Sequence, residues 1–186
     1  MTHTRLLICA LALALPAVAH GANPVVILDT SYGKIKIELF EDKTPITVKN
    51  FLQYADDKHY DGTIFHRVVA DMVIQGGGYT PLMDERKTRP PIKNESNKDL
   101  KNLRGTIGMA RTTDPDSATS QFFINVVDNP PFDVTATNPG YCVFGRVVDG
   151  MEVVDRIRKV TTVPSYASQN LPIEDIVVKS VQREKK

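Results

Sequence analysis

Short apolar runs that alternate with polar residues limit this chain to a fold built mainly from β-strands. The clearest run is 34–39, where lysine and glutamate side chains fall on one face and isoleucine and leucine side chains on the other. A period of two residues is the repeat of a strand with one buried face. Together with the apolar run 25–28 and a turn at 31–33, it predicts a hairpin with one face exposed to solvent.

Strand signals of similar length recur along the chain, and two segments have the spacing of helices. The strand signals lie at 64–69, 72–75, 106–110, 121–126, 142–147 and 175–181. Thr44 followed by Pro45 predicts the N-cap and first residue of one helix, and Asp149 with Glu152 resembles a capping box before a second. Many short strands with two helices and few βαβ units predict a mainly β fold, a closed antiparallel barrel with helices at its openings.

Residues 1–19 have the pattern of a secretory signal peptide. A basic residue precedes an apolar run at 6–15, and small residues end the segment. The run is too short to span a membrane, so export is expected, with cleavage after Ala19 or, alternatively, after Ala22. Residues 20–186 are then expected to form one domain. A buried N-terminal helix is the less favoured alternative.

The predicted mature chain is close to neutral and has a single cysteine. Removal of the leader takes away one arginine and leaves 22 basic against 22 acidic residues. This balance argues against nucleic acid as a partner and against membrane insertion or binding to an anionic membrane surface. Cys142 lies in a strand signal, which is more typical of a small buried side chain than of a nucleophile. The charged segment 84–104 predicts a solvated loop.

The sequence lacks the motifs of a hydrolase triad, a metal site and a phosphate-binding loop. No serine lies in a Gly-x-Ser-x-Gly context, so a hydrolase triad is not expected. The histidines after the leader lack ligand spacing, so no metal site is predicted. The glycine run 76–78 lacks the Lys-Ser/Thr of a phosphate-binding loop and is typical of a tight bend after a strand.

Arg67 lies among apolar residues of a strand signal and is hard to explain by packing. It alternates with Phe65 and Val69, so it shares their face, while His66 points to the other face. A half-buried guanidinium is costly unless it is paired or lines a wet cleft. A structural ion pair and a functional cleft are therefore both open for Arg67. For His66 we favour a core or hydrogen-bonded histidine over a general base.

Five motifs in register give the chain a resemblance to the cyclophilin family of peptidyl-prolyl isomerases, over residues 25–181. They are Phe65-His66-Arg67-Val68 with Met72-Val73-Ile74-Gln75-Gly76-Gly77, then Gly105-Thr106-Ile107-Gly108-Met109-Ala110, Ser120-Gln121-Phe122-Phe123-Ile124 and Val143-Phe144-Gly145-Arg146-Val147. The resemblance implies an eight-stranded antiparallel barrel closed by two α-helices. The leader and the segment 123–129 resemble the periplasmic bacterial branch, which implies localisation in the periplasm.

The resemblance also implies the site residues and the absence of a cofactor. Arg67 matches the family's catalytic arginine, and Gln75 is expected to act beside it. The remaining implied residues contact substrate. The walls of a proline pocket would be Phe65, Met72, Phe123 and Phe132, with Met109 nearby and Tyr141 at the position of the usual pocket histidine. Gln121 would hold the peptide, and the backbone of Ala110 and Arg111 would hold the residue before proline.

Some positions depart from the family pattern. Met72 replaces a common pocket phenylalanine and should still hold a proline ring. Pro131 stands where eukaryotic members have a tryptophan that contacts cyclosporin, so weak cyclosporin binding is expected. Arg111 replaces a common asparagine, and 112–119 is one residue longer than in the typical eukaryotic member.

The function expected from these observations is isomerisation of Xaa-Pro bonds in exported proteins as they fold, by a monomer whose partners are proline-containing polypeptides. The alternative is a proline-peptide binding module or holdase chaperone with weak turnover. The presence of both Arg67 and Gln75 favours the enzyme.

Overall fold

The computed structural model describes residues 23–164 and 170–184. The predicted signal peptide, 1–19, and both of its cleavage sites lie outside the described residues. The elements are β1 (Val25–Thr30), β2 (Gly33–Leu39), α1 (Pro45–Asp56), β3 (Arg67–Val69), β4 (Val73–Gly76), β5 (Thr106–Met109), β6 (Phe122–Asn125), the 3-10 helix η1 (Pro130–Phe132), β7 (Val143–Asp149), α2 (Met151–Ile157), β8 (Thr162–Val163), β9 (Leu171–Pro172) and β10 (Val178–Arg183).

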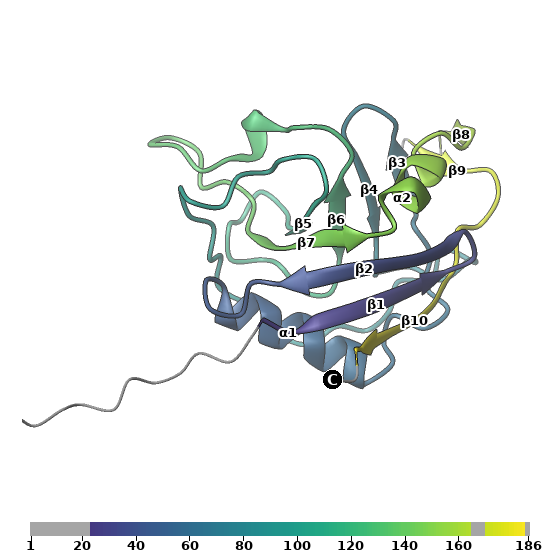
Figure 1. Ribbon diagram of the computed structural model, residues 1–186, viewed down its shortest axis with the longest axis horizontal. Coiled ribbons are helices and arrows are strands. Elements are labelled where there is room, and N and C mark those ends of the chain that lie inside the picture. The colour runs from purple at the N-terminus through teal and green to yellow at the C-terminus, as the bar shows by residue number, and fades with distance from the viewer. Residues whose placement is uncertain (1–22, 165–169, 185–186) are drawn as a thin grey trace, which may run out of the picture.

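Eight strands form one antiparallel sheet in the order β10-β1-β2-β7-β5-β6-β4-β3 (Figure 1). The mainly β fold with two α-helices is confirmed, but full closure of the barrel is wrong, because β10 and β3 do not pair as strands. The two edges meet at an isolated bridge between Ile64 and Val177. The amide of Val68 in the three-residue strand β3 instead donates to the carbonyl of Asn170, at 2.9 Å.

The β1–β2 hairpin follows the alternation in the sequence. Ile35, Ile37 and Leu39 are fully buried, while Lys36 and Glu38 between them are partly exposed. The last strand is less well predicted, since β10 begins at Val178 and runs past the expected end at 181. The two residues before β10 lie at the junction between the sheet edges, where the carbonyl of Ile176 accepts a hydrogen bond from the amide of Phe65 at 3.0 Å.

Helix α1 begins where the Thr44-Pro45 pair predicted, but its cap comes from elsewhere in the chain. The Thr44 hydroxyl donates to the carbonyl of Phe40 and makes no cap bond to the helix. The carboxylate of Glu95 instead accepts from the amides of Ile46 (3.1 Å) and Thr47 (2.7 Å). The loop that the sequence predicted to be merely solvated thus satisfies the first amides of α1.

Helix α2 lacks the predicted capping box. Gly150 is the N-cap residue, with φ 88°, and Asp149 accepts only the amide of Gly150. A side chain at Gly150 would also collide with the carbonyl of Lys34, so glycine is required by conformation and by space. The helix still packs as its spacing indicated, with Val154 and Ile157 fully buried.

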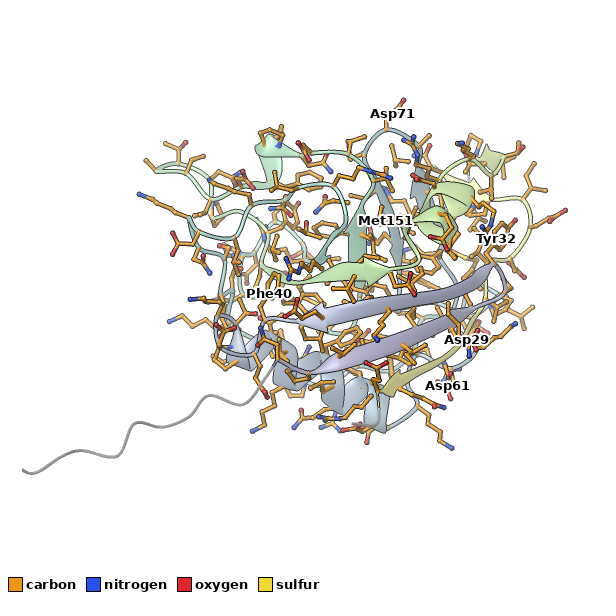
Figure 2. All side chains as sticks on the ribbon, viewed as in Figure 1. Asp29, Tyr32, Phe40, Asp61, Asp71 and Met151 are labelled. Carbon is orange, nitrogen blue, oxygen red and sulfur yellow. The ribbon has the colours of Figure 1, made fainter. Side chains whose placement is uncertain are left out.

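Both helices pack on the sheet, α1 against β10 and α2 against β2 (Figure 1). The core between them is aromatic, with the ring of Phe51 about 5–6 Å from the rings of Tyr60, Phe122 and Phe144. Charged side chains lie outside, as Asp71 does at the tip of the β3–β4 turn (Figure 2). No helix in 23–164 or 170–184 is long and apolar enough to cross a bilayer.

Candidate active site

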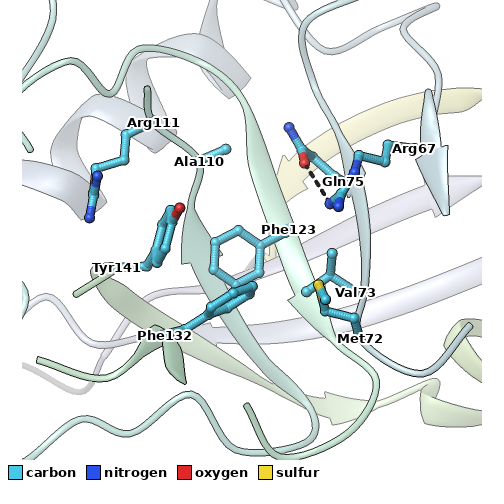
Figure 3. A pocket seen from close by; sticks show the side chains of 9 residues that line it. All are labelled: Arg67, Met72, Val73, Gln75, Ala110, Arg111, Phe123, Phe132 and Tyr141. Carbon is cyan, nitrogen blue, oxygen red and sulfur yellow. Dashed lines mark hydrogen bonds between the residues drawn. The ribbon is translucent and has the colours of Figure 1, made fainter. Parts of the chain in front are cut away.

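A cavity of about 300 Å³ opens beside the β3–β4 hairpin (Figure 3). Its walls come from this hairpin, β6, the residues after β5, η1 and the segment before β7. The lining residues are Arg67, Met72, Val73, Gln75, Ala110, Arg111, Phe123, Phe132 and Tyr141.

Arg67 and Gln75 are brought together by strand pairing. They are directly opposite in the β3–β4 register, and the guanidinium donates to the Gln75 side-chain oxygen at 3.4 Å (Figure 3). Gln75 in turn donates to Gln121 at 3.0 Å. Within the described chain, Arg67 has no carboxylate within 4.0 Å, so the structural ion pair considered from the sequence is absent. A permanent cation, partly buried and without a counter-charge, faces the cavity.

Three aromatic rings form the apolar side of the cavity. The ring centroid of Phe123 lies 5.7 Å from that of Phe132 and 5.8 Å from that of Tyr141, and both pairs are edge to face. Phe132 and Tyr141 lie 4.9 Å apart. Phe123 packs directly over Gly108, where any side chain would overlap its ring. The contact with Gly108 of β5 therefore fixes the Phe123 ring, which forms the floor of the cavity.

Arg111 borders the cavity opposite Arg67. Its guanidinium carbon lies 4.4 Å from the centre of the Tyr141 ring, a cation–π distance. The same side chain donates to the carbonyl of Gly140 at 2.9 and 3.2 Å and to that of Thr112 at 2.8 Å. This contact holds Tyr141 against the other two rings.

A second hollow of about 280 Å³ continues from the first. The two share Gln75, Ala110 and Arg111, and Gln121 lies in the second. The second hollow is also lined by four residues that were not predicted as site residues: Glu85, Thr112, Ser117 and Thr119. Because they share Gln75, Ala110 and Arg111, the two hollows form one continuous groove.

The structure gathers most of the predicted site residues around the cavity and leaves two in the core. Phe65, two residues before Arg67, is fully buried in the core, where its ring packs edge to face on Phe122 with centroids 5.9 Å apart. Met109 is 2% exposed at the end of β5. Neither lines the cavity, and a direct role for them in substrate binding stays a prediction. Val73 lines the cavity and was not selected from the sequence.

His66 lies outside the cavity and is 4% exposed. Its ring packs on Tyr79 with centroids 4.7 Å apart, and its Nδ1 has no hydrogen-bond partner in the part of the chain that the structure describes. Burial, reinforced by the neighbouring Arg67 charge, lowers its pKa to about 4. The imidazole is therefore neutral at ordinary pH and buried outside the cavity, as expected for a core histidine.

Comparison with known proteins agrees with this geometry. The family model described as cyclophilin type peptidyl-prolyl cis-trans isomerase/CLD matches residues 25–183. A peptidyl-prolyl cis-trans isomerase of Acinetobacter baylyi is 50% identical over 165 residues, with 88% of each chain covered. Peptidyl-prolyl cis-trans isomerase B of Escherichia coli is 52% identical over 160 residues, covering 84% of this chain and 98% of the relative.

Solved structures share the fold at lower identity. The crystal structure of a cyclophilin-type isomerase of Cryptosporidium parvum superposes with a TM-score of 0.73 and 27% identity, covering 88% of this chain and 99% of the other. A structure of that protein in the presence of the dipeptide Ala-Pro gives a TM-score of 0.72 at 28% identity, covering 87% and 99%. From the matched family model and these relatives, the chain belongs to the cyclophilin-type peptidyl-prolyl cis-trans isomerases.

Proposed function

We propose that this isomerase accelerates rotation about Xaa-Pro bonds in exported proteins as they fold in the periplasm, and that Arg67 is its catalytic donor. The observation that carries the proposal is the guanidinium of Arg67, which has no carboxylate partner among the described residues and lies at the edge of a cavity with an aromatic floor. A groove that continues past Gln75 offers room for the flanking peptide.

The chemistry suits a cation that does not titrate. Rotation of an Xaa-Pro amide faces a barrier of roughly 18–20 kcal/mol because resonance is lost at the twisted midpoint. At that midpoint the prolyl nitrogen regains its lone pair, so a fixed donor near the nitrogen favours the twisted state over either planar one. A guanidinium supplies such a donor without a proton transfer. One charge-assisted hydrogen bond contributes about 1.5–3 kcal/mol, roughly one to two powers of ten in rate.

The remaining residues are assigned to binding. The proline ring would rest on Phe123 between Met72 and Phe132, out of water. Gln75, which bonds Arg67 on one side and Gln121 on the other, would fix the donor and contact the peptide. The related parasite protein has been crystallised in the presence of Ala-Pro, which supports proline-containing peptides as ligands here. Pro131 offers no indole, so cyclosporin binding should be weak.

The test is cis-to-trans isomerisation of a short Xaa-Pro peptide by residues 20–186 beside Arg67→Ala, with Arg183→Ala as a matched control. Arg183 pairs with Asp56 at 2.7 Å and does not line the cavity. The wild type and Arg183→Ala should accelerate the reaction, and Arg67→Ala should lose about 10- to 100-fold in kcat/KM while still folded. If the wild type binds proline peptides without accelerating the reaction, the chain is a binding module or holdase and not an isomerase.

A pH profile tests the mechanism separately. Since a guanidinium does not titrate near neutrality, kcat/KM should be nearly flat from about pH 6 to 9. A steep loss centred near pH 6.5 would assign the chemistry to a histidine instead.

The export proposal rests on residues 1–19 and has its own test. The full chain, produced in a bacterium, should appear in the periplasmic fraction with a mass that fits cleavage after Ala19, or after Ala22 as the alternative. Uncleaved protein in the cytoplasm would remove exported proteins as the substrates and leave the isomerase activity untouched.

A further inference from the structure

Three buried asparagines lie behind the cavity without lining it. Asn102, Asn125 and Asn129 are 1%, 0% and 8% exposed. They come from the loop before β5, the end of β6 and the residue before η1. A buried side-chain amide is costly unless its donors and acceptor are satisfied, so a cluster of three needs an explanation.

The three amides form a chain of hydrogen bonds that runs in one direction. Asn129 donates to the side-chain oxygen of Asn125 at 2.7 Å, and Asn125 donates to that of Asn102 at 3.3 Å. Asn102 then donates to the backbone carbonyl of Phe132 at 3.1 Å. Amides linked in this order polarise one another, so each bond strengthens the next.

The ends of this chain reach the backbones of cavity residues from separate segments. Asn129 donates to the carbonyl of Met72 at 2.9 Å, and Asn102 approaches the carbonyl of Tyr141 at 3.5 Å as well as that of Phe132. A backbone bond from the amide of Asn129 to the carbonyl of Asn102, 2.8 Å long, ties the two ends together. The network thus joins the β3–β4 turn to the two segments that carry Phe132 and Tyr141.

We propose that Asn102, Asn125 and Asn129 are positioning residues that set the spacing between Met72 and Phe132 and so determine the affinity for the proline ring. This proposal rests on the proposed binding role of that cavity. The three amides touch no substrate and act through the wall residues.

The geometry separates this effect from catalysis. Arg67 and Gln75 are held by the β3–β4 pairing and by Gln121, and none of these contacts passes through the asparagines. The amide of Val126 also donates to the carbonyl of Met72, at 3.1 Å, and β4 pairs with β6 along its length, so this side of the cavity keeps its place when the Asn129 side chain is lost. Shortening an asparagine should therefore loosen the far wall of the cavity and leave the donor in place.

The experiment compares Asn102→Ala and Asn129→Ala with Thr30→Val in the peptide isomerisation assay, at a temperature where near-UV circular dichroism shows all of them folded. Thr30 is a fully buried polar residue whose hydroxyl donates to Gly33 at 2.7 Å in the β1–β2 hairpin, away from the cavity. KM should rise about threefold to tenfold in each asparagine variant, the range expected when a wall residue loses one neutral hydrogen bond, from Asn102 to Phe132 or from Asn129 to Met72, with kcat within about twofold. Thr30→Val should lower the melting temperature without changing KM.

An unchanged KM in folded asparagine variants of an active enzyme would overturn the positioning role and leave the proposed function intact. If the variants do not fold, the NMR signals of the side-chain amides in the wild-type protein test the proposal instead. Saturation with an Ala-Pro peptide should shift the NH₂ signals of all three asparagines but not that of Gln53 on α1. Shifts confined to the cavity residues would overturn the proposal. A wild type that neither turns over nor binds the peptide would remove the proposed function and the positioning role together.

Discussion

Gln75 and Arg67 are paired in register on adjacent strands, and their side chains meet at 3.4 Å, long for a hydrogen bond to a charged donor. The guanidinium is therefore oriented by Gln75 without being neutralised. A neutral partner at this position keeps the charge available to a substrate, which a carboxylate would not.

Replacement of Gln75 by glutamate tests this relationship. Gln75→Glu places a carboxylate beside Arg67, and the resulting ion pair should compete with the prolyl nitrogen for the guanidinium. We expect kcat/KM to fall about tenfold or more, and Gln75→Leu, which leaves the cation free, to lose less. Kinetics of the two variants side by side provide the measurement. A glutamate variant as active as the wild type would show that Arg67 needs no free charge.

Gly108 is predicted to control the height of the cavity floor. A methyl group at this position would overlap the Phe123 ring, which must then move toward the cavity. Gly108→Ala should raise KM about tenfold, since overpacking of this kind costs roughly 1–3 kcal/mol, while the sheet stays folded. Isomerisation kinetics and near-UV circular dichroism check both parts. An unchanged KM would mean that the backbone of β5 yields instead of the ring.

Burial of His66 predicts a loss of stability in mild acid. The unfolded ring takes up a proton near pH 6.5, whereas the folded ring has its pKa lowered to about 4 by burial. The unfolded state therefore binds more protons between these values, and the free energy of unfolding falls as the pH drops through this window. His66 alone should account for about 2 kcal/mol between pH 7 and pH 5.

Urea unfolding at the two pH values measures this loss. His66→Phe, which keeps a ring and removes the titration, should retain its stability at pH 5 better than the wild type does. An equal loss in both proteins would place the acid sensitivity elsewhere, for example at His59, whose pKa burial also lowers.

Glu95 is predicted to stabilise the protein although it lies in a loop outside the cavity. Its carboxylate accepts from two amides at the N-terminus of α1 and from the hydroxyl of Thr47 at 2.7 Å. Glu95→Ala should lower the free energy of unfolding by about 1–2 kcal/mol, and Glu95→Gln, which keeps an acceptor, by less. Chemical denaturation gives both values. Equal losses in the two variants would argue against a cap, and isomerase activity should not change.

Cys142 is predicted to be unreactive in the folded protein. The thiol is 4% exposed, and burial raises its pKa to about 11 even though Thr47 lies within hydrogen-bonding distance. With about 100-fold less thiolate than an ordinary cysteine, it should react with a disulfide reagent at pH 8 only after unfolding. Rapid modification of the native protein would contradict this burial.

Local patterns predicted the elements of the fold that depend on neighbouring residues. The alternation at 34–39 and the Thr44-Pro45 pair each reflect a constraint within a few residues, and β2 and α1 follow them. The family resemblance supplied the site, because Phe123 has no local feature that distinguishes a cavity wall from core packing, and the alternation that singled out Arg67 left an ion pair and a cleft both open.

Features that depend on distant contacts were missed. Glu95 caps a helix that begins 50 residues earlier in the chain, and no local pattern links the two. The sheet edges stay unpaired as strands because β3 is short and bonds to Asn170. Phe65 points into the core because its partner, Phe122, comes from β6.

The pairing of β1 with β10 decides when this protein can finish folding. Val26 lies opposite Arg183 and Leu28 opposite Val181, so β1 cannot complete its strand pairing before β10 is available. Such non-local pairing slows folding and leaves one edge of the hairpin bare in the meantime. A chain that emerges N-terminus first, from a ribosome or a translocation pore, cannot complete its sheet until residues 178–183 have been released, and no N-terminal fragment can substitute for that step.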